Sequence, residues 1–284
     1  MRDLWPESLC AVGMGTADSF LHRTLAKIAA FLYRASDRIV VVTPAFKDYL
    51  VEKWRVPPEK MVLVENGVDT ELFSPHSGGS DIRKELGAEG KFVVSYIGTI
   101  GMAHGLETLV EAASRLRQVS PAVVFLLVGE GAEKVRIISL ARARGLTNVH
   151  FIDQQARQKI PAYICASDAC VVSLKKTELF KTVLPTKMLE FMSCARPVIL
   201  TVDGHARDFL EKAAAGIYAE PESPSELANA VMRIARDPAL GKSLGRNGRR
   251  YVLENSTRQR TARTYLDVLE DLLQEGRAHS PLAA

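Results

Sequence analysis

The sequence predicts an α/β fold in which a parallel sheet is covered by helices on both faces. From residue 91 onward, short runs of β-branched and other apolar residues alternate with longer amphipathic stretches. The runs are apolar throughout, as expected of strands that are buried on both faces. Because parallel strands are joined by right-handed crossovers, this order of elements predicts a doubly wound domain.

The expected elements alternate from residue 91 to the 230s. Strands are expected where the apolar runs fall, at 91–98, 122–131, 148–152, 169–174, 196–202 and 216–220. Six helices are expected between and after these strands. The first begins near 106, the second ends near 144, the third covers about 156–166, the fourth follows Pro185, the fifth covers about 205–213 and the sixth begins at Ser225. In the first of them, apolar residues recur at helical spacing: Leu106, Leu109, Val110, Ala113 and Leu116.

Residues 1–75 hold too few elements for a second complete domain of this kind. They predict a helix near 17–35, a strand at 38–44, a helix opened by Pro44 with Thr43 as its N-cap, and an extended segment at 60–69. The stretch "SPHSGGSD" at 74–81 is linker-like. We therefore expect a partial N-terminal domain at 1–75 and a complete domain at 76–255. Residues 256–284 are expected to form a helix and tail that cross back to the N-terminal part.

Composition and charge argue against a nucleic-acid partner. The 284 residues are 47% hydrophobic and 25% charged, with a net charge of +4 and no concentrated basic stripe. The four cysteines form no C-x-x-C pair, which favours reduced, buried thiols. No apolar run reaches the roughly 20 residues of a membrane span, and the first residues lack a signal-peptide pattern, so we expect a cytoplasmic protein.

The residues that follow the strands are the candidates for a binding site, because ligands of open parallel sheets bind beyond the carboxyl ends of the strands. The first strand ends in "GTIGMAHG", whose glycines Gly98, Gly101 and Gly105 allow a ligand to approach the backbone. The helix that follows offers free N–H groups to an anion. Gly129 ends the second strand in the same way. The alternative for both glycine segments is that they form tight strand-to-helix turns without binding a ligand.

A charged cluster surrounds the helix that Pro185 opens. Its lysines are Lys175, Lys176, Lys181 and Lys187. Lys187 and Glu190 lie three residues apart on one helix face. A lysine near the positive helix N-terminus is unfavourable by roughly a few tenths of a kcal/mol, which indicates a role beyond helix stability. A diphosphate would satisfy Lys187, and Glu190 can accept hydrogen bonds from a sugar diol. The alternative for the lysines is a solvated run of surface charge, and the alternative for Lys187 and Glu190 is an ordinary surface ion pair.

Several catalytic motifs are missing from the sequence. It contains no D-x-D, H-E-x-x-H, P-loop or G-x-S-x-G pattern, which argues against a carboxylate-held metal, a zincin, a P-loop nucleotidase and an α/β-hydrolase. Phosphate charge would then be neutralised by lysines and helix N-termini, with no metal ion and no cofactor.

The motifs as a set resemble those of glycosyltransferase family 4, the retaining nucleotide-sugar transferases of the two-domain GT-B fold. The resemblance covers nearly the whole chain. The segments that carry it, in family order, are "RDLWPES", "SDRIVVVTPAFKDYL", "VENGVDTELFSP", "YIGTIGMAHGLETLVEAA", "LLVGEGAEK", "LTNVHFID", "ASDACVVSL", "FKTVLPTKMLEFMSCARPVI" and "AAAGIYAEPESPSELANAV".

The resemblance implies a nucleotide diphosphate sugar, with a UDP-sugar favoured, bound by the C-terminal domain. Glu190 matches the second glutamate of the family's Glu-x7-Glu motif and would hold the ribose. Lys187 and the glycines of the 98–105 loop would hold the diphosphate, and "NVHFID" would border the base. We therefore assign Lys187 and Glu190 to the catalytic site. The acceptor would be a glycan or lipid-linked glycan in surface polysaccharide synthesis.

The chain also departs from the family pattern. Thr182 stands where the first glutamate of the motif is expected, and Thr99 and His104 stand where an arginine and a lysine are common. We expect His104 to donate to a phosphate, and Lys181 to assist Lys187. Much of the acceptor domain of the family precedes "RDLWPES", so the resemblance implies a chain truncated at its N-terminus.

Other functions remain open at this point. A nucleotide-sugar epimerase shares the GT-B fold, and a non-catalytic nucleotide-sugar-binding subunit would tolerate the missing half-domain and Thr182. A dinucleotide-dependent oxidoreductase is disfavoured, because "GTIGMAHG" lacks G-x-G-x-x-G spacing. The first helix is basic and amphipathic, which suits peripheral contact with the inner face of the cell membrane or packing on its own domain. Its residues are Phe20, Leu21, Ile28 and Phe31, flanked by His22, Arg23, Lys27 and Arg34.

Overall fold

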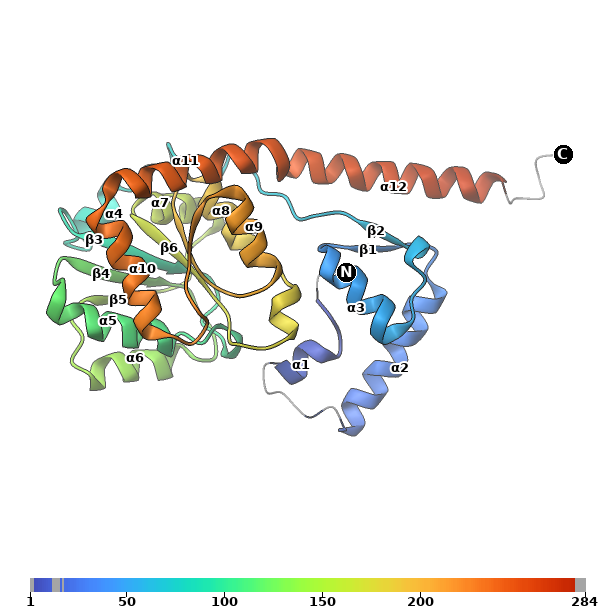
Figure 1. Cartoon of the computed structure of the whole chain (residues 1–284), viewed down its shortest axis with the longest axis horizontal. Coiled ribbons are helices and arrows are strands. Elements are labelled where there is room, and N and C mark those ends of the chain that lie inside the picture. Colours follow the sequence, from blue (N-terminus) through green and yellow to red (C-terminus); the bar gives the residue numbers. More distant parts are fainter. Residues whose placement is uncertain (1–2, 12–15, 17, 279–284) are drawn as a thin grey trace.

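The structure, a computed structural model, describes residues 3–11, 16 and 18–278. The remaining residues, which include the start of the predicted first helix and the end of the predicted C-terminal tail, lie outside this description. The described chain contains a six-stranded sheet flanked by helices and a smaller part built around a two-stranded sheet (Figure 1). Both sheets are parallel.

The large sheet has the strand order β5-β4-β3-β6-β7-β8. Its order reverses between β3 and β6, the first and fourth strands along the chain, which defines the switch point of a doubly wound sheet. The α/β fold with a doubly wound parallel sheet is therefore confirmed. The strands are β3 (Phe92–Ile97), β4 (Val123–Val128), β5 (Val149–Ile152), β6 (Ala169–Ser173), β7 (Val198–Thr201) and β8 (Gly216–Tyr218).

Side chains of each strand alternate between two buried clusters, one on each face of the large sheet. In β3, Val93 and Ile97 join one cluster, whereas Val94 and Tyr96 join the other. The first face is covered by α7 (Ile160–Cys165), α8 (Thr186–Ser193), α9 (His205–Ala213) and α11 (Pro238–Asn255). The second face is covered by α5 (Glu107–Val119), α6 (Lys134–Ala143) and α10 (Pro224–Arg236).

The smaller part pairs β1 (Ile39–Val41) with β2 (Met61–Leu63) and packs them on α3 (Pro44–Trp54). Thr43 is the N-cap of α3, as predicted: its hydroxyl accepts from the Phe46 N–H at 3.2 Å, and Pro44 occupies the first turn. This capping ends β1 at Val41, which makes the strand shorter than the predicted 38–44. The other helices before the large sheet are α1 (Glu7–Ala11), α2 (Phe20–Ala35) and α4 (Ser80–Glu85).

Short 3-10 turns complete the chain: η1 (Pro58–Lys60), η2 (Met102–His104), η3 (Arg157–Lys159) and η4 (Leu179–Thr182). Three of them are the next elements after strands of the large sheet: η2 after β3, η3 after β5 and η4 after β6. They therefore lie at the carboxyl edge, where a ligand is expected.

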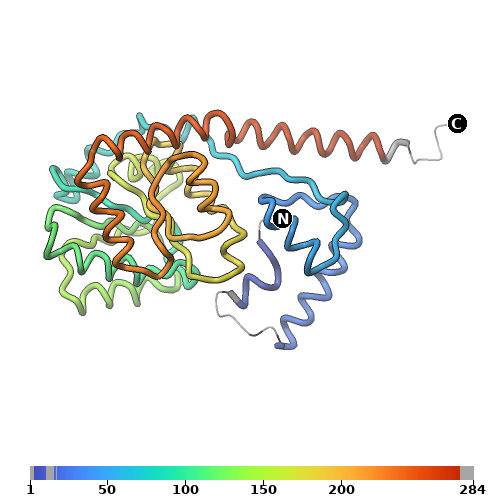
Figure 2. The backbone as a smooth tube through the Cα atoms, in the orientation of Figure 1, coloured from blue at the N-terminus to red at the C-terminus, as the bar shows by residue number. Residues whose placement is uncertain are grey.

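The last helix, α12 (Arg258–Ala278), extends from the large sheet to the smaller part (Figures 1 and 2). Several contacts connect it to the smaller part and to the segment that follows β2. Thr261 Oγ1 donates to the Glu65 carbonyl at 2.9 Å, Arg258 pairs with Asp69 at 3.4 Å, and Arg38 pairs with Glu275 at 2.5 Å. A second connection is made by Thr43 Oγ1, which donates to the Thr182 carbonyl at 2.8 Å. The predicted boundaries at residues 75 and 255 stay predictions.

Candidate functional site

A cavity of about 430 Å³ lies at the carboxyl edge of the large sheet, beside the switch point between β3 and β6. Its walls come from the ends of β3, β4 and β5, from η2 and from α8. The residues predicted from the sequence that line it are Gly98, Thr99, His104, Gly129, Lys187 and Glu190. The structure thus brings together, from three separate segments, most of the predicted site.

Two glycines let neighbouring groups approach each other at the cavity wall. Gly98 has a φ of +143°, and a Cβ there would lie 2.6 Å from Lys187 Nζ. Gly129 has a φ of +147°, and a Cβ there would lie 2.0 Å from the Gly98 carbonyl oxygen. Any side chain at these positions would displace the lysine or separate the two strand ends. The glycines after β3 and β4 are therefore required by the geometry of the site.

Lys187 contributes an ammonium group to the cavity. It projects from the first turn of α8 and lies beneath Gly98, with Nζ donating to the Tyr96 hydroxyl at 3.0 Å and 4.2 Å from the centre of the Tyr96 ring. Burial lowers the pKa of Lys187 to about 8, although the carboxylate of Glu190 acts in the opposite direction. No ion pair joins this ammonium group to a carboxylate in the described part of the chain. The group is therefore available to an anionic ligand.

Glu190 lies one turn further along α8 and also faces the cavity. Burial raises the pKa of its carboxyl, and the nearby guanidinium of Arg157 opposes this shift. Arg157 Nη2 lies 3.3 Å from Glu190 Oε1, and its guanidinium stacks 5.1 Å from the centre of the Phe73 ring. The carboxylate keeps acceptor capacity for a ligand, because one contact of this length occupies only part of it.

His104 ends η2 and reaches the cavity from the loop after β3. Its Nδ1 lies 3.3 Å from the Gly101 carbonyl oxygen. Burial and, secondarily, the charge of Lys187 lower the pKa of His104 to about 4. The imidazole is therefore neutral near pH 7.

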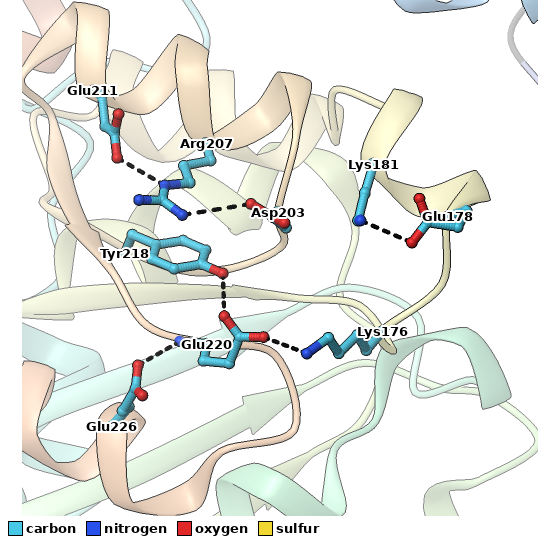
Figure 3. Close-up of polar contacts among 9 residues, drawn as sticks. All are labelled: Lys176, Glu178, Lys181, Asp203, Arg207, Glu211, Tyr218, Glu220 and Glu226. Carbon is cyan, nitrogen blue, oxygen red and sulfur yellow. Dashed lines mark hydrogen bonds and ion pairs between the residues drawn. The ribbon is translucent and has the colours of Figure 1, made fainter.

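The other lysines of the predicted cluster do not converge on this cavity. Lys176 pairs with Glu220 at 2.6 Å, and Lys181 pairs with Glu178 at 2.8 Å, as Figure 3 shows. Glu220 also accepts from the Tyr218 hydroxyl at 2.7 Å. These two lysines already have carboxylate partners at the surface. Only Lys187 among them lines the cavity.

Four predicted residues do not line the cavity. Gly101 and Gly105 shape the η2 loop, and Gly105 closes it in a left-handed conformation with a φ of +57°. Lys181 and Thr182 belong to η4, whose Leu179 packs against the core of the smaller part. This packing directs η4 toward the N-terminal part instead of the cavity. Their predicted contact with a ligand has no support in this geometry and stays a prediction.

Of the residues in or behind the cavity wall that the sequence did not predict, Tyr96 and Arg157 contact predicted ones. Tyr96 is fully buried, and its hydroxyl donates to the Thr99 carbonyl at 2.6 Å while accepting from Lys187. The signal for it was a hydroxyl-bearing ring near the carboxyl end of the buried strand β3. Arg157 follows β5, so it also lies beyond the carboxyl end of a strand, where ligands of parallel sheets bind.

A second cavity, of about 340 Å³, lies between the smaller part and the large sheet. It is lined by residues of both, among them Asp3, Phe46 and Asn66 from the N-terminal part. His104 and Lys187 line this cavity as well as the first. These two side chains therefore stand where the two cavities meet.

Neither a metal site nor a membrane-spanning helix is present among the described residues. No group of three or more histidine, cysteine, aspartate or glutamate side chains is arranged to hold a metal ion there. Among the described helices, none is both long enough and apolar enough to cross a membrane.

Comparison with known proteins identifies the family. The family model described as "Glycosyl transferases group 1" matches residues 80–251, which is more than half of the chain. The chain belongs to the group 1 glycosyl transferases. A second model, "Glycosyltransferase Family 4", matches residues 11–72. The family match of this group 1 chain includes β3 to β8 and all the residues that line the first cavity except Phe73.

Curated relatives of this group 1 chain are longer proteins. D-inositol 3-phosphate glycosyltransferase of Salinispora tropica is 28% identical over 258 residues, which cover 85% of this chain and 52% of the relative. Alpha-D-kanosaminyltransferase of Streptomyces kanamyceticus is 24% identical over 222 residues, which cover 75% and 55%. The chain thus spans about half the length of the curated relatives it matches.

Solved structures confirm the predicted GT-B fold class. Anabaena HepE, solved in complex with UDP and glucose, aligns with a TM-score of 0.77 and 21% identity, covering 87% of this chain and 67% of HepE. Sucrose-phosphate synthase from Thermosynechococcus elongatus aligns with a TM-score of 0.77 and 26% identity, covering 94% and 66%. The expectation from the motifs, a group 1 glycosyltransferase of GT-B type, is therefore correct at the level of family and fold.

Proposed function

We propose that the first cavity binds a nucleoside diphosphate sugar and that the chain takes part in transfer of the sugar to an acceptor hydroxyl. The observation that carries this proposal is the ammonium group of Lys187, which faces the cavity without a carboxylate partner in the described structure. A partly buried cation of this kind is stabilised when an anion binds beside it. The diphosphate would lie over Gly98, where the missing side chain leaves the lysine accessible.

The remaining groups suit the rest of a nucleotide sugar. Glu190 lies one helical turn from Lys187, and its carboxylate can accept hydrogen bonds from the ribose hydroxyls. Gln154 and Gln155, after β5, offer both donors and acceptors to a base. HepE is solved with UDP and with UDP-glucose, and TarM of S. aureus with UDP, which supports a UDP-sugar as donor.

Catalysis would be electrostatic. An acceptor hydroxyl attacks the anomeric carbon, the bond from that carbon to the phosphate oxygen breaks, and the nucleoside diphosphate leaves with the bonding electrons. The departing phosphate oxygen takes up the proton that the hydroxyl loses. Lys187 stabilises the charge that develops on the departing phosphate. We propose a retaining, metal-independent reaction that takes place where the two cavities meet, with a glycan or lipid-linked glycan entering from the second cavity.

Peripheral contact with an anionic membrane is proposed for α2. Phe20, Leu21, Ile28, Phe31 and Leu32 form an apolar stripe along this helix, with exposed fractions from 51% to 86%. Arg23, Lys27 and Arg34 lie along one edge of the stripe, which suits a lipid interface with anionic headgroups. Sedimentation with phosphatidylglycerol vesicles should exceed that with phosphatidylcholine vesicles, and the Phe20→Ser, Phe31→Ser double variant should abolish the difference. Equal sedimentation of the protein with both kinds of vesicle would contradict contact of α2 with an anionic membrane.

Product analysis tests the proposed transfer. The chain is incubated with UDP-glucose, with and without a glycan acceptor, and the sugar products are separated. Transfer predicts a glycosylated acceptor that keeps the anomeric configuration of the donor. Epimerised sugar or UDP formed equally well without acceptor would indicate the epimerase alternative, and tight donor binding with no product would indicate a binding subunit.

A further inference from the structure

We propose that Nε2 of His104 accepts a hydrogen bond from a hydroxyl group of the bound donor sugar or of the incoming acceptor. The proposal rests on the proposed function, because it takes a sugar substrate as given. It reverses the role expected from the sequence, in which His104 donates to a phosphate. Three features support it: the fixed backbone of the loop, the tautomer of the ring, and the position of His104 between two cavities.

The backbone of η2 is held by the end of β6. Ser173 Oγ donates to the His104 carbonyl at 2.7 Å, and the Lys175 N–H donates to the Ala103 carbonyl at 2.8 Å. Within the loop, the His104 N–H donates to the Gly101 carbonyl at 3.1 Å. These bonds tie η2 to the carboxyl end of β6, so the ring starts from a fixed position.

The tautomer follows from the partner of Nδ1. The Gly101 carbonyl oxygen can only accept, so the 3.3 Å contact with Nδ1 requires the proton to be on Nδ1. In a neutral imidazole the other nitrogen, Nε2, then carries a lone pair and is an acceptor. Phosphate oxygens are acceptors as well and cannot pair with it. A hydroxyl group can.

The surroundings of the ring keep it neutral. Lys187 approaches from α8, and the Tyr96 ring packs edge-to-face against His104 with centroids 5.9 Å apart. Burial and the charge of Lys187 lower the pKa of His104 to about 4, and its hydrogen bond to Gly101 opposes this shift only in part. Since the side chain lines both cavities and no partner of Nε2 exists among the described residues, this acceptor is free for a ligand.

Two measurements test the proposal. The first is the ¹⁵N spectrum of the histidine rings in the full chain, assigned with the His104→Gln variant. It should show His104 neutral at pH 7 with the proton on Nδ1. A protonated ring, or a proton on Nε2, would overturn the proposal whether or not the chain binds a nucleotide.

The second measurement compares UDP and UDP-glucose binding by calorimetry in the wild type, His104→Ala and the control His76→Ala, an exposed histidine of the linker. We expect His104→Ala to leave UDP affinity unchanged. If the hydroxyl belongs to the donor sugar, UDP-glucose affinity falls roughly threefold to tenfold, as for one lost hydrogen bond. If it belongs to the acceptor, both affinities stay unchanged and the KM for the acceptor rises by a similar factor.

Two results would overturn the proposal: an equal loss of UDP and UDP-glucose affinity, which indicates a phosphate contact, or no change in binding and turnover. Failure of the proposed function looks different, because wild type and His76→Ala would then bind no UDP at all.

Discussion

The ammonium group of Lys187 lies 3.0 Å from the hydroxyl of Tyr96 and 4.2 Å from the centre of its ring. Tyr96 thus contacts the cation with a lone pair and with the negative face of its π-system. The same hydroxyl donates to the Thr99 carbonyl at 2.6 Å. One buried side chain therefore fixes both the cation and the turn after β3, the two groups to which we assign the diphosphate.

Replacing Tyr96 with phenylalanine should weaken UDP binding without unfolding the protein. The ring stays in place, but the ammonium group loses an acceptor and Thr99 loses a donor. We expect UDP affinity at pH 7 to fall roughly fivefold to tenfold, and the pH at which binding weakens to move down by about half a unit. Calorimetry from pH 6 to 9 measures both. A uniform loss of affinity with an unchanged pH profile would mean that Tyr96 only supports the fold.

UDP binding by the wild type should depend on pH through Lys187. Its pKa of about 8 means that the ammonium form predominates below pH 8 and is lost above it. When affinity is measured with UDP-glucose, whose diphosphate does not titrate near pH 6 as the terminal phosphate of UDP does, it should therefore be level from pH 5.5 to 7.5 and decline toward pH 9.5. His104, with a pKa of about 4, should contribute no change in this range. An inflection near pH 6.5 would indicate a charged histidine in the site and contradict the assignment.

Lys187 should also lower the stability of the free protein. Its pKa is about 8 in the folded chain and 10.5 in the unfolded chain, so the unfolded state binds more protons between these values. The penalty is complete below pH 8 and is relieved as the pH rises toward 10.5. Lys187→Met should therefore raise the Tm by a few degrees at pH 7, and the gain should shrink by pH 10. A lower Tm at pH 7 would show that the Tyr96 contact outweighs burial.

Glu190 should distinguish ribose from deoxyribose. If its carboxylate accepts from the ribose hydroxyls, the wild type should bind UDP more tightly than 2′-deoxy-UDP by roughly tenfold, as expected for a hydrogen bond to a charged group. Glu190→Gln should weaken UDP binding and reduce this preference to about twofold. The exposed Glu211→Gln variant of α9 is the control. An unchanged preference in Glu190→Gln would place the ribose elsewhere.

The sheet and the cavity walls could be predicted from the sequence because their signals are local. Continuous apolar runs indicate buried parallel strands, and glycines directly after two of them mark the places where Lys187 and the neighbouring strand approach. The helix after Pro185 places Lys187 and Glu190 on one face by spacing alone. These relationships needed no knowledge of distant contacts.

What could not be predicted depends on packing between segments far apart in the chain. Lys181 and Lys187 look alike in the sequence, yet η4 packs on the smaller part while α8 faces the cavity. The partner of Glu190 is Arg157, 33 residues away. The role of His104 depends on which atom Nδ1 contacts, which residue identity does not reveal.

The most direct test of the account is UDP binding by the Lys187→Ala variant, compared with the exposed Lys212→Ala variant of α9 as control. We predict micromolar-range calorimetric binding in wild type and Lys212→Ala, and a loss of roughly tenfold to a hundredfold in Lys187→Ala, as expected for one charge-assisted contact to a phosphate. Equal UDP affinity in all three proteins would contradict the assignment of the diphosphate to Lys187.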